Sequence, residues 1–218
     1  MIDLRIAEKS IPEPGGGKRV LFKQTRFQLT HEDASVALLG RSGSGKTTLL
    51  RMLAGLDVRY RGEYRVKGAR QVGGLRELAL IRRHTIGYIT QEPSLLRGRS
   101  IRDNVLLGMC RSQRSMDLAE QLLGEVGLAL SPRTRVDHLS GGEAQRVCIA
   151  RALVREPRVI LADEPTGSLD EATESSVLGL LLRLQEKGVQ FVVATHSSTV
   201  AAACHRAVRI ENLKLVAA

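Results

Sequence analysis

The hydrophobic positions of this chain gather in short runs that are separated by longer segments of mixed character. Several runs contain Val and Ile, and their nearly continuous apolarity is typical of strands that are buried on both faces of a sheet. They occupy residues 4–7, 35–39, 86–89, 159–162, 191–194 and 207–210. The pattern therefore predicts a set of short buried strands spread over the whole chain.

Apolar residues at helical spacing predict helices between these strands. The helices cover residues 46–54, 116–126, 143–154 and 171–187. Strands that alternate with helices indicate an α/β domain with a largely parallel sheet. Pro12, Pro14 and the glycines at 15–17 predict a turn between the first strand and a further segment at 20–29. Residues 100–132 show no convincing strand, so we expect a helical lobe inserted into the sheet domain.

Composition limits the size and the chemistry of the core. The 218 residues suit one domain, or one domain with a lobed insertion. Apolar residues make up 43% of the chain, but there are only three Tyr, three Phe and no Trp. The core is therefore expected to be mostly aliphatic.

The chain is strongly basic, with a formal net charge of 33 − 23 = +10. This charge fits a nucleic acid, an anionic membrane surface or phosphate ligands. Because few aromatic residues are present to stack on bases, we favour a membrane surface over single-stranded nucleic acid. Cys110, Cys148 and Cys204 are far apart, so we expect reduced thiols of a cytosolic protein and no disulfide or zinc framework. The sequence shows no signal peptide and no apolar run of membrane-spanning length, so we expect any membrane role to depend on a partner.

A glycine-rich segment, Gly40-Arg41-Ser42-Gly43-Ser44-Gly45-Lys46-Thr47, follows the apolar run at 35–39 and opens a predicted helix. This order of strand, loop, Lys-Thr pair and helix is that of a phosphate-binding loop. Its backbone N–H groups and the helix N-terminus attract the β- and γ-phosphates. Lys46 adds a charge on the same oxygens, and the Thr47 hydroxyl is a ligand for Mg²⁺. A glycine turn that only caps a helix is the alternative, which the completeness of the motif disfavours.

Two carboxylates follow the apolar run at 159–162. Asp163 at the end of a buried strand suits a Mg²⁺ site beside the phosphate loop. Glu164 is expected to point to the other side of the chain, where it can polarise the attacking water. An ordinary acidic strand end before the turn at Pro165 is the alternative, and the phosphate loop elsewhere in the chain disfavours it.

Gln91 and His196 also follow predicted strands. Open α/β sheets bind ligands at the C-terminal ends of their strands. A single Gln or His in a loop is more often a solvated residue, but the shared placement makes both candidates. His196 could donate to the γ-phosphate, and Gln91 could contact Mg²⁺ or the attacking water. The remaining histidines, His31, His84, His138 and His205, are expected to be surface or structural residues.

A second small turn, Leu139-Ser140-Gly141-Gly142, precedes the helix predicted at 143–154. Ser140 and the N–H groups of Gly141 and Gly142 form a potential anion site at the start of this helix. Nothing requires that site to serve its own chain.

Together these motifs resemble those of the ATP-binding cassette (ABC) ATPases over nearly the whole chain. The phosphate loop, Gln91, the LSGG turn, Asp163-Glu164, Ser168-Leu169-Asp170 and His196 occur in the order and spacing of that family. The resemblance implies one nucleotide-binding domain over residues 1–218. Its fold class is α/β, with a RecA-like P-loop NTPase core, a mostly parallel sheet, an antiparallel β subdomain and an inserted α-helical lobe at roughly residues 92–150.

The resemblance also implies an ATPase that uses Mg²⁺ and forms a head-to-tail dimer, in which the LSGG turn of one chain closes over ATP on the phosphate loop of the other. Glu164, His196, Gln91 and Lys46 would be the catalytic residues, with Glu164 as the base. The metal would be held by Thr47, Gln91 and Asp163. The nucleotide would be bound by Gly40, Ser42, Gly43, Ser44, Gly45, Lys46, Thr47 and Thr48 and, from the second chain, by Ser140, Gly141 and Gly142.

A narrower match is to the lipoprotein-releasing, macrolide-export and cell-division ATPases. It rests on residues 91–96, on Asp103-Asn104-Val105, on Glu143 where most cassettes have Gln, and on residues 162–170. It implies an integral membrane transporter subunit as partner, together with a second copy of the chain or a related ATPase, and no nucleic acid. The protein would then be cytoplasmic and peripheral on the inner face of the cell membrane.

One departure from the family concerns the base of the nucleotide. The family normally has an aromatic residue near the end of the first strand that stacks on adenine. Lys9-Ser10-Ile11-Pro12 has none, and the first aromatic residue is Phe22. We therefore expect similar affinities for ATP and GTP.

Other functions remain open from the sequence. An ABC ATPase of iron–sulfur cluster assembly is also a single short cassette. DNA-maintenance and translation members are less favoured, because the chain has no long coiled-coil insertion and no second cassette. A nucleotide-binding regulator without turnover is disfavoured because every catalytic position is filled.

Overall fold

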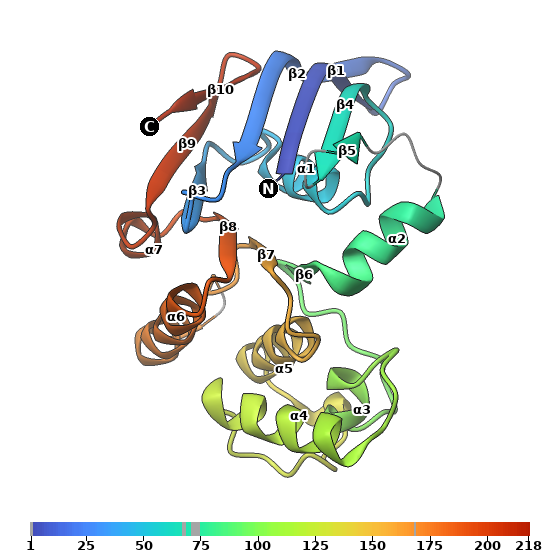
Figure 1. The fold of residues 1–218 in the computed structure, drawn as a ribbon, viewed down its shortest axis with the longest axis vertical. Helices are drawn as coiled ribbons and strands as arrows, with labels where there is room; N and C mark the ends of the chain where they lie inside the picture. The colour runs from blue at the N-terminus through green and yellow to red at the C-terminus, as the bar shows by residue number, and fades with distance from the viewer. Residues whose placement is uncertain (1, 67–68, 71–74, 168) are drawn as a thin grey trace. The chain divides into compact units, whose positions relative to one another are not determined.

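Strands and helices alternate along most of the chain, as the hydrophobic pattern predicts (Figure 1). The computed structural model describes residues 2–66, 69–70, 75–167 and 169–218. The chain divides into unit 1, made of Met1–His84 and Gln190–Ala218, and unit 2, made of Thr85–Val189. Unit 1 contains β1 (Ile2–Pro12), β2 (Lys18–Leu29), β3 (Ser35–Leu39), α1 (Lys46–Leu53), β4 (Arg61–Val66), β5 (Ala69–Arg70), α2 (Leu75–His84), β8 (Gln190–Ala194), α7 (Ser198–Ala202), β9 (Arg206–Glu211) and β10 (Lys214–Ala217). Unit 2 contains β6 (Ile86–Ile89), α3 (Ile101–Val105), α4 (Gln113–Glu125), the 3₁₀ helix η1 (Val136–His138), α5 (Gly141–Leu153), β7 (Val159–Asp163) and α6 (Glu171–Glu186).

The first sheet of unit 1 is antiparallel, in the order β2-β1-β4-β5. The turn predicted at residues 12–17 joins β1 to β2, and the Glu13 N–H donates to the Gly17 carbonyl at 2.9 Å. Ile2, Leu4 and Ile6 are buried, whereas Arg5 is exposed. The apolar run at 4–7 therefore belongs to a strand with one exposed face, and the prediction of burial on both faces is wrong for it. This sheet is the antiparallel β subdomain that the resemblance implies.

The second set of strands in unit 1 has β3 at its centre, between β8 and β9. All three are parallel, and β10 runs antiparallel along β9. Val36, Ala37 and Leu38 are completely buried, as the continuous apolar run at 35–39 predicts. Strand β10 also contacts β2, since the Leu215 N–H donates to the Thr25 hydroxyl at 2.9 Å. The two sets of strands are thus connected within unit 1.

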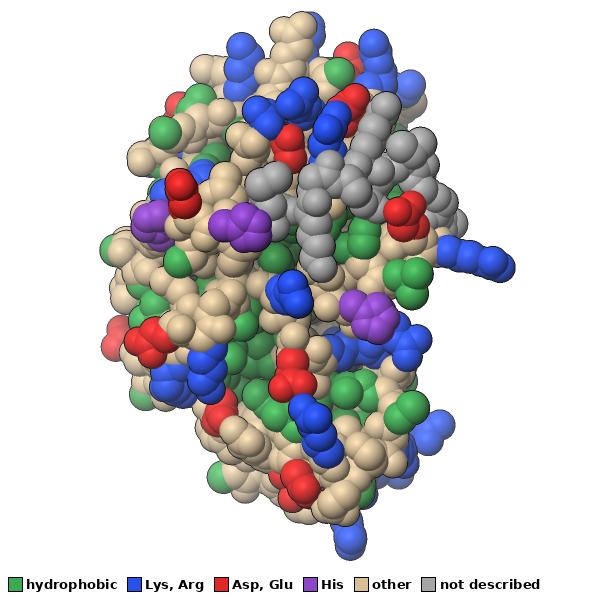
Figure 2. Space-filling view, in the orientation of Figure 1, with side chains coloured by type: hydrophobic (Ala, Val, Ile, Leu, Met, Phe, Trp, Pro, Cys, Tyr) green, Lys and Arg blue, Asp and Glu red, His purple; other side chains and the backbone are tan. Residues whose placement is uncertain are grey.

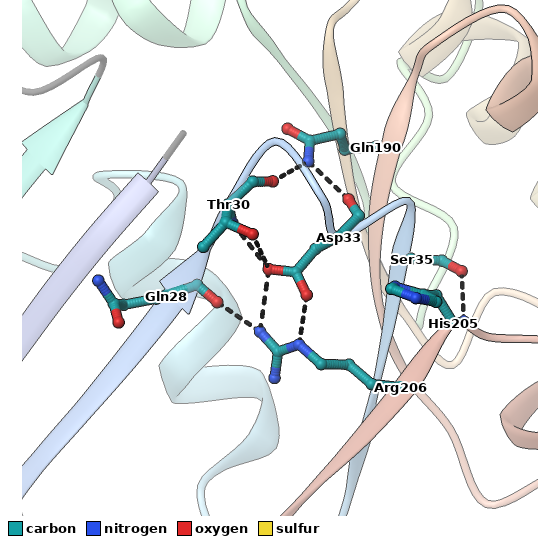
Figure 3. A network of polar contacts seen from close by, with 7 residues as sticks. All are labelled: Gln28, Thr30, Asp33, Ser35, Gln190, His205 and Arg206. Atoms are coloured by element: carbon teal, nitrogen blue, oxygen red, sulfur yellow. Dashed lines mark hydrogen bonds and ion pairs between the residues drawn. The ribbon is translucent and has the colours of Figure 1, made fainter.

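A polar network joins the starts of β3, β8 and β9 (Figure 3). Asp33 lies between β2 and β3, and its carboxylate accepts hydrogen bonds from Arg206 and from the backbone N–H of Thr30, the latter at 2.7 Å. The Gln190 side chain donates to the carbonyls of Thr30 and Asp33, and Arg206 also donates to the Gln28 carbonyl. We call these five residues the Asp33 network.

The Asp33 carboxylate is ionised in this network. Burial raises its pKa, but the hydrogen bonds from Arg206 and from the backbone and hydroxyl of Thr30 outweigh burial, so the pKa lies below its ordinary value. The Arg206 guanidinium also lies 6.0 Å from the centre of the Phe27 ring. Buried charge at these strand starts is therefore paired and hydrogen-bonded.

In unit 2, β6 and β7 are parallel neighbours, with Ile86 opposite Val159. All residues of β7 are buried, as predicted for the run at 159–162. A Cβ at Gly87 would lie 2.9 Å from the Ala152 carbonyl oxygen, so α5 packs closely on β6. Residues 100–132 hold α3 and α4 and no named strand, in agreement with the sequence. The lobe boundaries at roughly residues 92–150 stay a prediction.

Several short elements carry little sequence signal. Strand β4 contains three charged residues, β10 is four residues long and mostly exposed, and α2 combines a basic last turn with few buried residues. None of the described helices has both the length and the apolar character that a membrane span requires.

Candidate functional site

The phosphate loop predicted at residues 40–47 connects the buried strand β3 to helix α1. Gly45 is the N-cap of α1 with φ 110°, a conformation that favours glycine, and no side chain caps this helix end. A Cβ at Gly45 would also lie 3.0 Å from the Phe22 ring. The first turn of α1 contains no acidic residue, so its N–H groups are available to an anion.

Lys46 and His196, which are 150 positions apart, meet at this loop. The Lys46 Nζ atom lies 3.1 Å from His196 Nε2, 2.8 Å from the Gly40 carbonyl oxygen and 3.5 Å from that of Arg41. Because a lysine ammonium can only donate, His196 Nε2 is the acceptor in this contact. Lys46 is 7% exposed, and His196 is exposed. The structure therefore brings together two of the predicted catalytic residues.

Part of the loop lines an open space. A cavity of about 630 Å³ is bounded by Gly40, Arg41, Ser44, Thr195 and His196 and by the turn between β9 and β10. Ser44 Oγ is buried and has no hydrogen-bond partner among the described residues. Ser42 and Thr47 are exposed and Thr48 is half-buried. The loop thus contributes the hydroxyl-bearing residue Ser44 to the cavity lining, and Ser42 and Thr47 present their side chains to solvent.

Unit 2 holds the other predicted catalytic and metal-binding residues, at the ends of its two strands. Gln91 is exposed two residues beyond β6. Asp163 is the last residue of β7 and is 3% exposed. Glu164 is half-buried, with φ 48°, so the chain turns sharply after Asp163. In the described part of the chain, no cluster of three or more His, Cys, Asp or Glu side chains is arranged to hold a metal by itself.

Gln145 connects these two strand ends, although no sequence motif marks it as a site residue. Its side chain on α5 is fully buried, and its Nε2 atom donates to the carbonyl of Thr90 at 3.1 Å and to that of Pro165 at 3.4 Å. Thr90 precedes Gln91, and Pro165 follows Glu164. The only sequence signal is a polar residue on the buried side of a helix, which is easily mistaken for a solvated position.

The LSGG turn forms the start of α5 in the same unit. Ser140 is the N-cap, and its N–H and its hydroxyl donate to Glu143 Oε2 at 2.8 Å and 2.9 Å. These hydrogen bonds, the backbone one first, hold the pKa of Glu143 below its ordinary value. A Cβ on Gly141 would meet nothing within 4 Å, so packing inside the chain does not require glycine there. Asp170 caps α6, and Ser168 lies outside the described residues.

The net positive charge of the chain is not concentrated on the face in Figure 2. There the described Lys and Arg side chains are scattered among acidic, apolar and polar ones. His31, His84, His138 and His205 are exposed, as expected for surface residues.

Residues 22–167 match the sequence family described as ABC transporter. The chain is 38% identical over 216 residues to the macrolide export ATP-binding/permease protein MacB of Bdellovibrio bacteriovorus, with coverage of 97% of this chain and 33% of that protein. It is 42% identical over 228 residues to MacB 1/2 of Paracoccus denitrificans, with coverage of 100% and 33%. The chain thus spans about one third of the length of these curated relatives. They give no support to the iron–sulfur alternative.

A solved structure covers nearly the whole chain. It is the dimeric structure of a post-hydrolysis state of the ATP-binding cassette MJ0796 bound to ADP and Pi. The similarity has a TM-score of 0.90 with 30% identity, over 99% of this chain and 96% of that one. This similarity confirms the predicted α/β P-loop NTPase fold class.

Proposed function

The chain belongs to the ABC transporter family of ATPases, and on this basis we propose that it is the ATP-hydrolysing cassette that drives a membrane transporter. The observation that supports the proposal most is the contact between Lys46 and His196 at a complete phosphate loop. A loop that only capped helix α1 would need neither a buried lysine nor a histidine from a distant strand end.

The loop N–H groups and Lys46 bind the β- and γ-phosphates of ATP, assisted by Ser42, Ser44 and Thr48. Thr47, Asp163 and Gln91 supply the hard oxygen ligands that Mg²⁺ prefers, and the buried carboxylate of Asp163 fits that role. When bound with the nucleotide, Mg²⁺ neutralises charge on the phosphates. The assignment of these ligands rests on residue chemistry and on the family resemblance.

Glu164 acts as the general base of hydrolysis. Its carboxylate accepts a proton from water while the water oxygen bonds to the γ-phosphorus and the bond to the bridging oxygen of ADP breaks. His196 donates to the γ-phosphate, and Gln91 orients the water or the metal. Gln145 holds the backbone next to both Gln91 and Glu164 through its hydrogen bonds to Thr90 and Pro165.

Two cassettes work together in this proposal. Ser140, Gly141 and Gly142 bind the γ-phosphate of ATP held by a second copy of the chain or by a related ATPase. The open space next to Gly141 supports this role, since a ligand from outside the chain can approach the backbone there. The dimeric state of the solved cassette that this chain resembles also supports it.

The membrane partner is a transporter subunit that spans the membrane, and the cassette lies on its cytoplasmic face. The proteins named as ATP-binding/permease proteins, which this chain matches over about one third of their length, support such a partner. We propose that residues 1–218 form one nucleotide-binding domain and that the segment near residues 93–101 receives a short helix of the partner.

The proposal is tested with the variant Glu164→Gln. We expect it to bind ATP normally but to hydrolyse it about 10²- to 10⁴-fold more slowly, because it lacks the base. Measured with Mg-ATP, turnover at the wild-type rate would falsify the assignment of Glu164.

The same variant, purified from membranes with Mg-ATP, should retain its transporter. Co-purification of an integral membrane protein is the expected result, and wild type with ADP is the control. Recovery of soluble partners alone would overturn the transporter assignment.

A further inference from the structure

The phosphate loop accounts for the phosphates of a nucleotide but not for its base. Most aromatic side chains of unit 1 are buried in the core. They are at most 5% exposed and comprise Phe22, Phe27, Tyr64 and Phe191. The Phe22 ring lies underneath the loop, close to Gly45. Tyr60 is half-buried, and burial raises its pKa to about 12. In the described part of unit 1, no exposed Phe or Tyr ring lies at the loop, and the exposed imidazole of His196 is already placed at Lys46.

A planar group that contacts the loop away from Lys46 and His196 is the guanidinium of Arg19. Arg19 lies near the start of β2, paired with Ile11 of β1, and its side chain is exposed. Its Nη2 atom donates to the Gly43 carbonyl at 2.9 Å. Both Nη atoms lie 3.8 Å from the position that a Cβ on Gly43 would occupy. The guanidinium therefore rests against the tip of the phosphate loop.

The two sides of the loop differ in chemistry. Lys46 and His196 meet at Gly40 and Arg41, whereas Arg19 contacts Gly43. A nucleotide carries its γ-phosphate at one end and its base at the other. Because Lys46 and His196 suit the γ-phosphate, the base has to lie away from them, and Arg19 contacts a different residue of the loop.

We propose that the Arg19 guanidinium stacks on the purine base of the bound nucleotide. The proposal rests on the proposed function as an ATPase. A guanidinium is planar and stacks on aromatic faces, with an added cation–π attraction. The hydrogen bond to Gly43 holds this plane in place before the nucleotide binds, which lowers the entropy lost on binding.

Lys9 of β1 also has a long cationic side chain, but it is not available to contact the base. Lys9 is 3% exposed, and its Nζ atom lies 2.6 Å from the Asp57 carboxylate. Stacking does not depend on the hydrogen-bonding groups of the base, so Arg19 discriminates little between adenine and guanine.

The test compares ligands with and without a base by calorimetry, using ATP, GTP and tripolyphosphate with Mg²⁺. For Arg19→Ala we expect the affinities for ATP and GTP to fall about tenfold, within the range of base–side-chain stacking, and that for tripolyphosphate to stay unchanged. Arg19→Lys keeps the charge but loses the plane, so it should weaken ATP binding nearly as much. Arg19→Tyr should restore it. Lys18→Ala, which removes an exposed charge from the same hairpin, is the control and should bind ATP normally.

Three results would overturn the proposal. If Arg19→Ala lost equal affinity for ATP and tripolyphosphate, Arg19 would contact the phosphates. If ATP affinity were unchanged in Arg19→Ala, Arg19 would not contact the nucleotide. If Arg19→Lys bound ATP with full affinity, the charge alone would matter. If the wild-type chain itself bound neither ATP nor tripolyphosphate, the proposed function would fail, and Arg19 would have no base to bind.

Discussion

The two ends of the parallel strands β3, β8 and β9 use charged side chains in opposite ways. At their N-terminal ends, the Asp33 network pairs a buried carboxylate with Arg206 and hydrogen-bonds it to Thr30. At their C-terminal ends, the phosphate loop places Lys46 against carbonyls of its own loop and leaves Ser44 Oγ buried with no hydrogen-bond partner among the described residues. The first arrangement is satisfied within the chain, whereas the second is suited to receive an anion.

This difference follows from strand direction. The C-terminal ends of β3 and β8 lead into the loops that carry Lys46 and His196, and the N-terminus of α1 points at the same place. Ligands in open α/β sheets bind at that end. In the described segments that lead into β3 and β9, no helix begins at the opposite end, so a buried charge there needs a partner from the chain itself. Four substitution experiments test the comparison.

The largest effect is expected for Lys46→Ala. Removing the buried cation should weaken ATP binding more than about a hundredfold, roughly 3 kcal/mol, because it deletes a charged hydrogen-bond partner of the phosphates. Calorimetric titration with Mg-ATP measures this loss. The free energy of unfolding without nucleotide should change less than it does for the substitution of Asp33 described next. A variant that unfolds readily but binds ATP well would contradict the comparison.

The second prediction concerns Asp33→Ala. It leaves Arg206 and the Thr30 N–H without their acceptor, and we expect the free energy of unfolding to fall by about 2 kcal/mol. The value is modest because the Arg206 side chain is 35% exposed. Denaturant titration measures the change. ATP affinity of the folded protein should stay the same, and a parallel loss of ATP affinity would show that the two ends are not independent.

The third prediction is a pH dependence. The pKa of Asp33 is lower in the folded chain than the value of about 3.9 expected when unfolded, so its contribution to stability is present above that value. It is lost as the pH falls through the lower, folded pKa. The difference in unfolding free energy between wild type and Asp33→Asn should be constant from about pH 5 to 7 and should shrink below about pH 4. If this difference in unfolding free energy grew in acid, the pKa of Asp33 would be raised by folding, and its carboxylate would not be paired with Arg206.

The smallest effect distinguishes two hydroxyl groups. Ser44→Ala removes a buried hydroxyl that has no partner among the described residues, so the unfolding free energy should stay equal or rise slightly. Thr30→Val removes a hydroxyl that donates to Asp33 at 3.0 Å, and it should cost about 1 kcal/mol. Thermal unfolding of both variants gives the comparison. Equal destabilisation by the two substitutions would mean that the Ser44 hydroxyl makes a stabilising hydrogen bond, as the Thr30 hydroxyl does.

The sequence predicted the central parts of the fold because they carry strong local signals. The strand at residues 35–39, the glycine loop and the start of α1 at Lys46 agree with the structure. Asp163 ends a buried strand as predicted. The residue pattern was weaker for β4 and α2, which carry several charges, for the short and mostly exposed β10, and for β1, whose apolar run did not reveal its exposed face.

Residues that act through contacts with distant parts of the chain could not be recognised from the sequence. Gln145 has no motif that marks it as buried, and its two acceptors lie 55 and 20 positions away. Arg19 belongs to a charged hairpin, and only its hydrogen bond to Gly43, 24 positions away, separates it from its neighbours. The roles of Asp163, Glu164 and the LSGG turn in hydrolysis stay predictions.

What the sequence determined by itself is the local chemistry: a glycine loop between a strand and a helix, a strand that ends in Asp163, and a turn that begins α5. Each depends on residues that are close along the chain, where backbone conformation and helix capping decide the structure. The tertiary structure decided which distant groups meet, including Lys46 with His196, Arg206 with Asp33, and Arg19 with Gly43. The first two contacts depend on strand order and direction, because the parallel strands β3, β8 and β9 bring residues far apart in sequence to the same end of a sheet, whereas Arg19 reaches Gly43 from the antiparallel sheet.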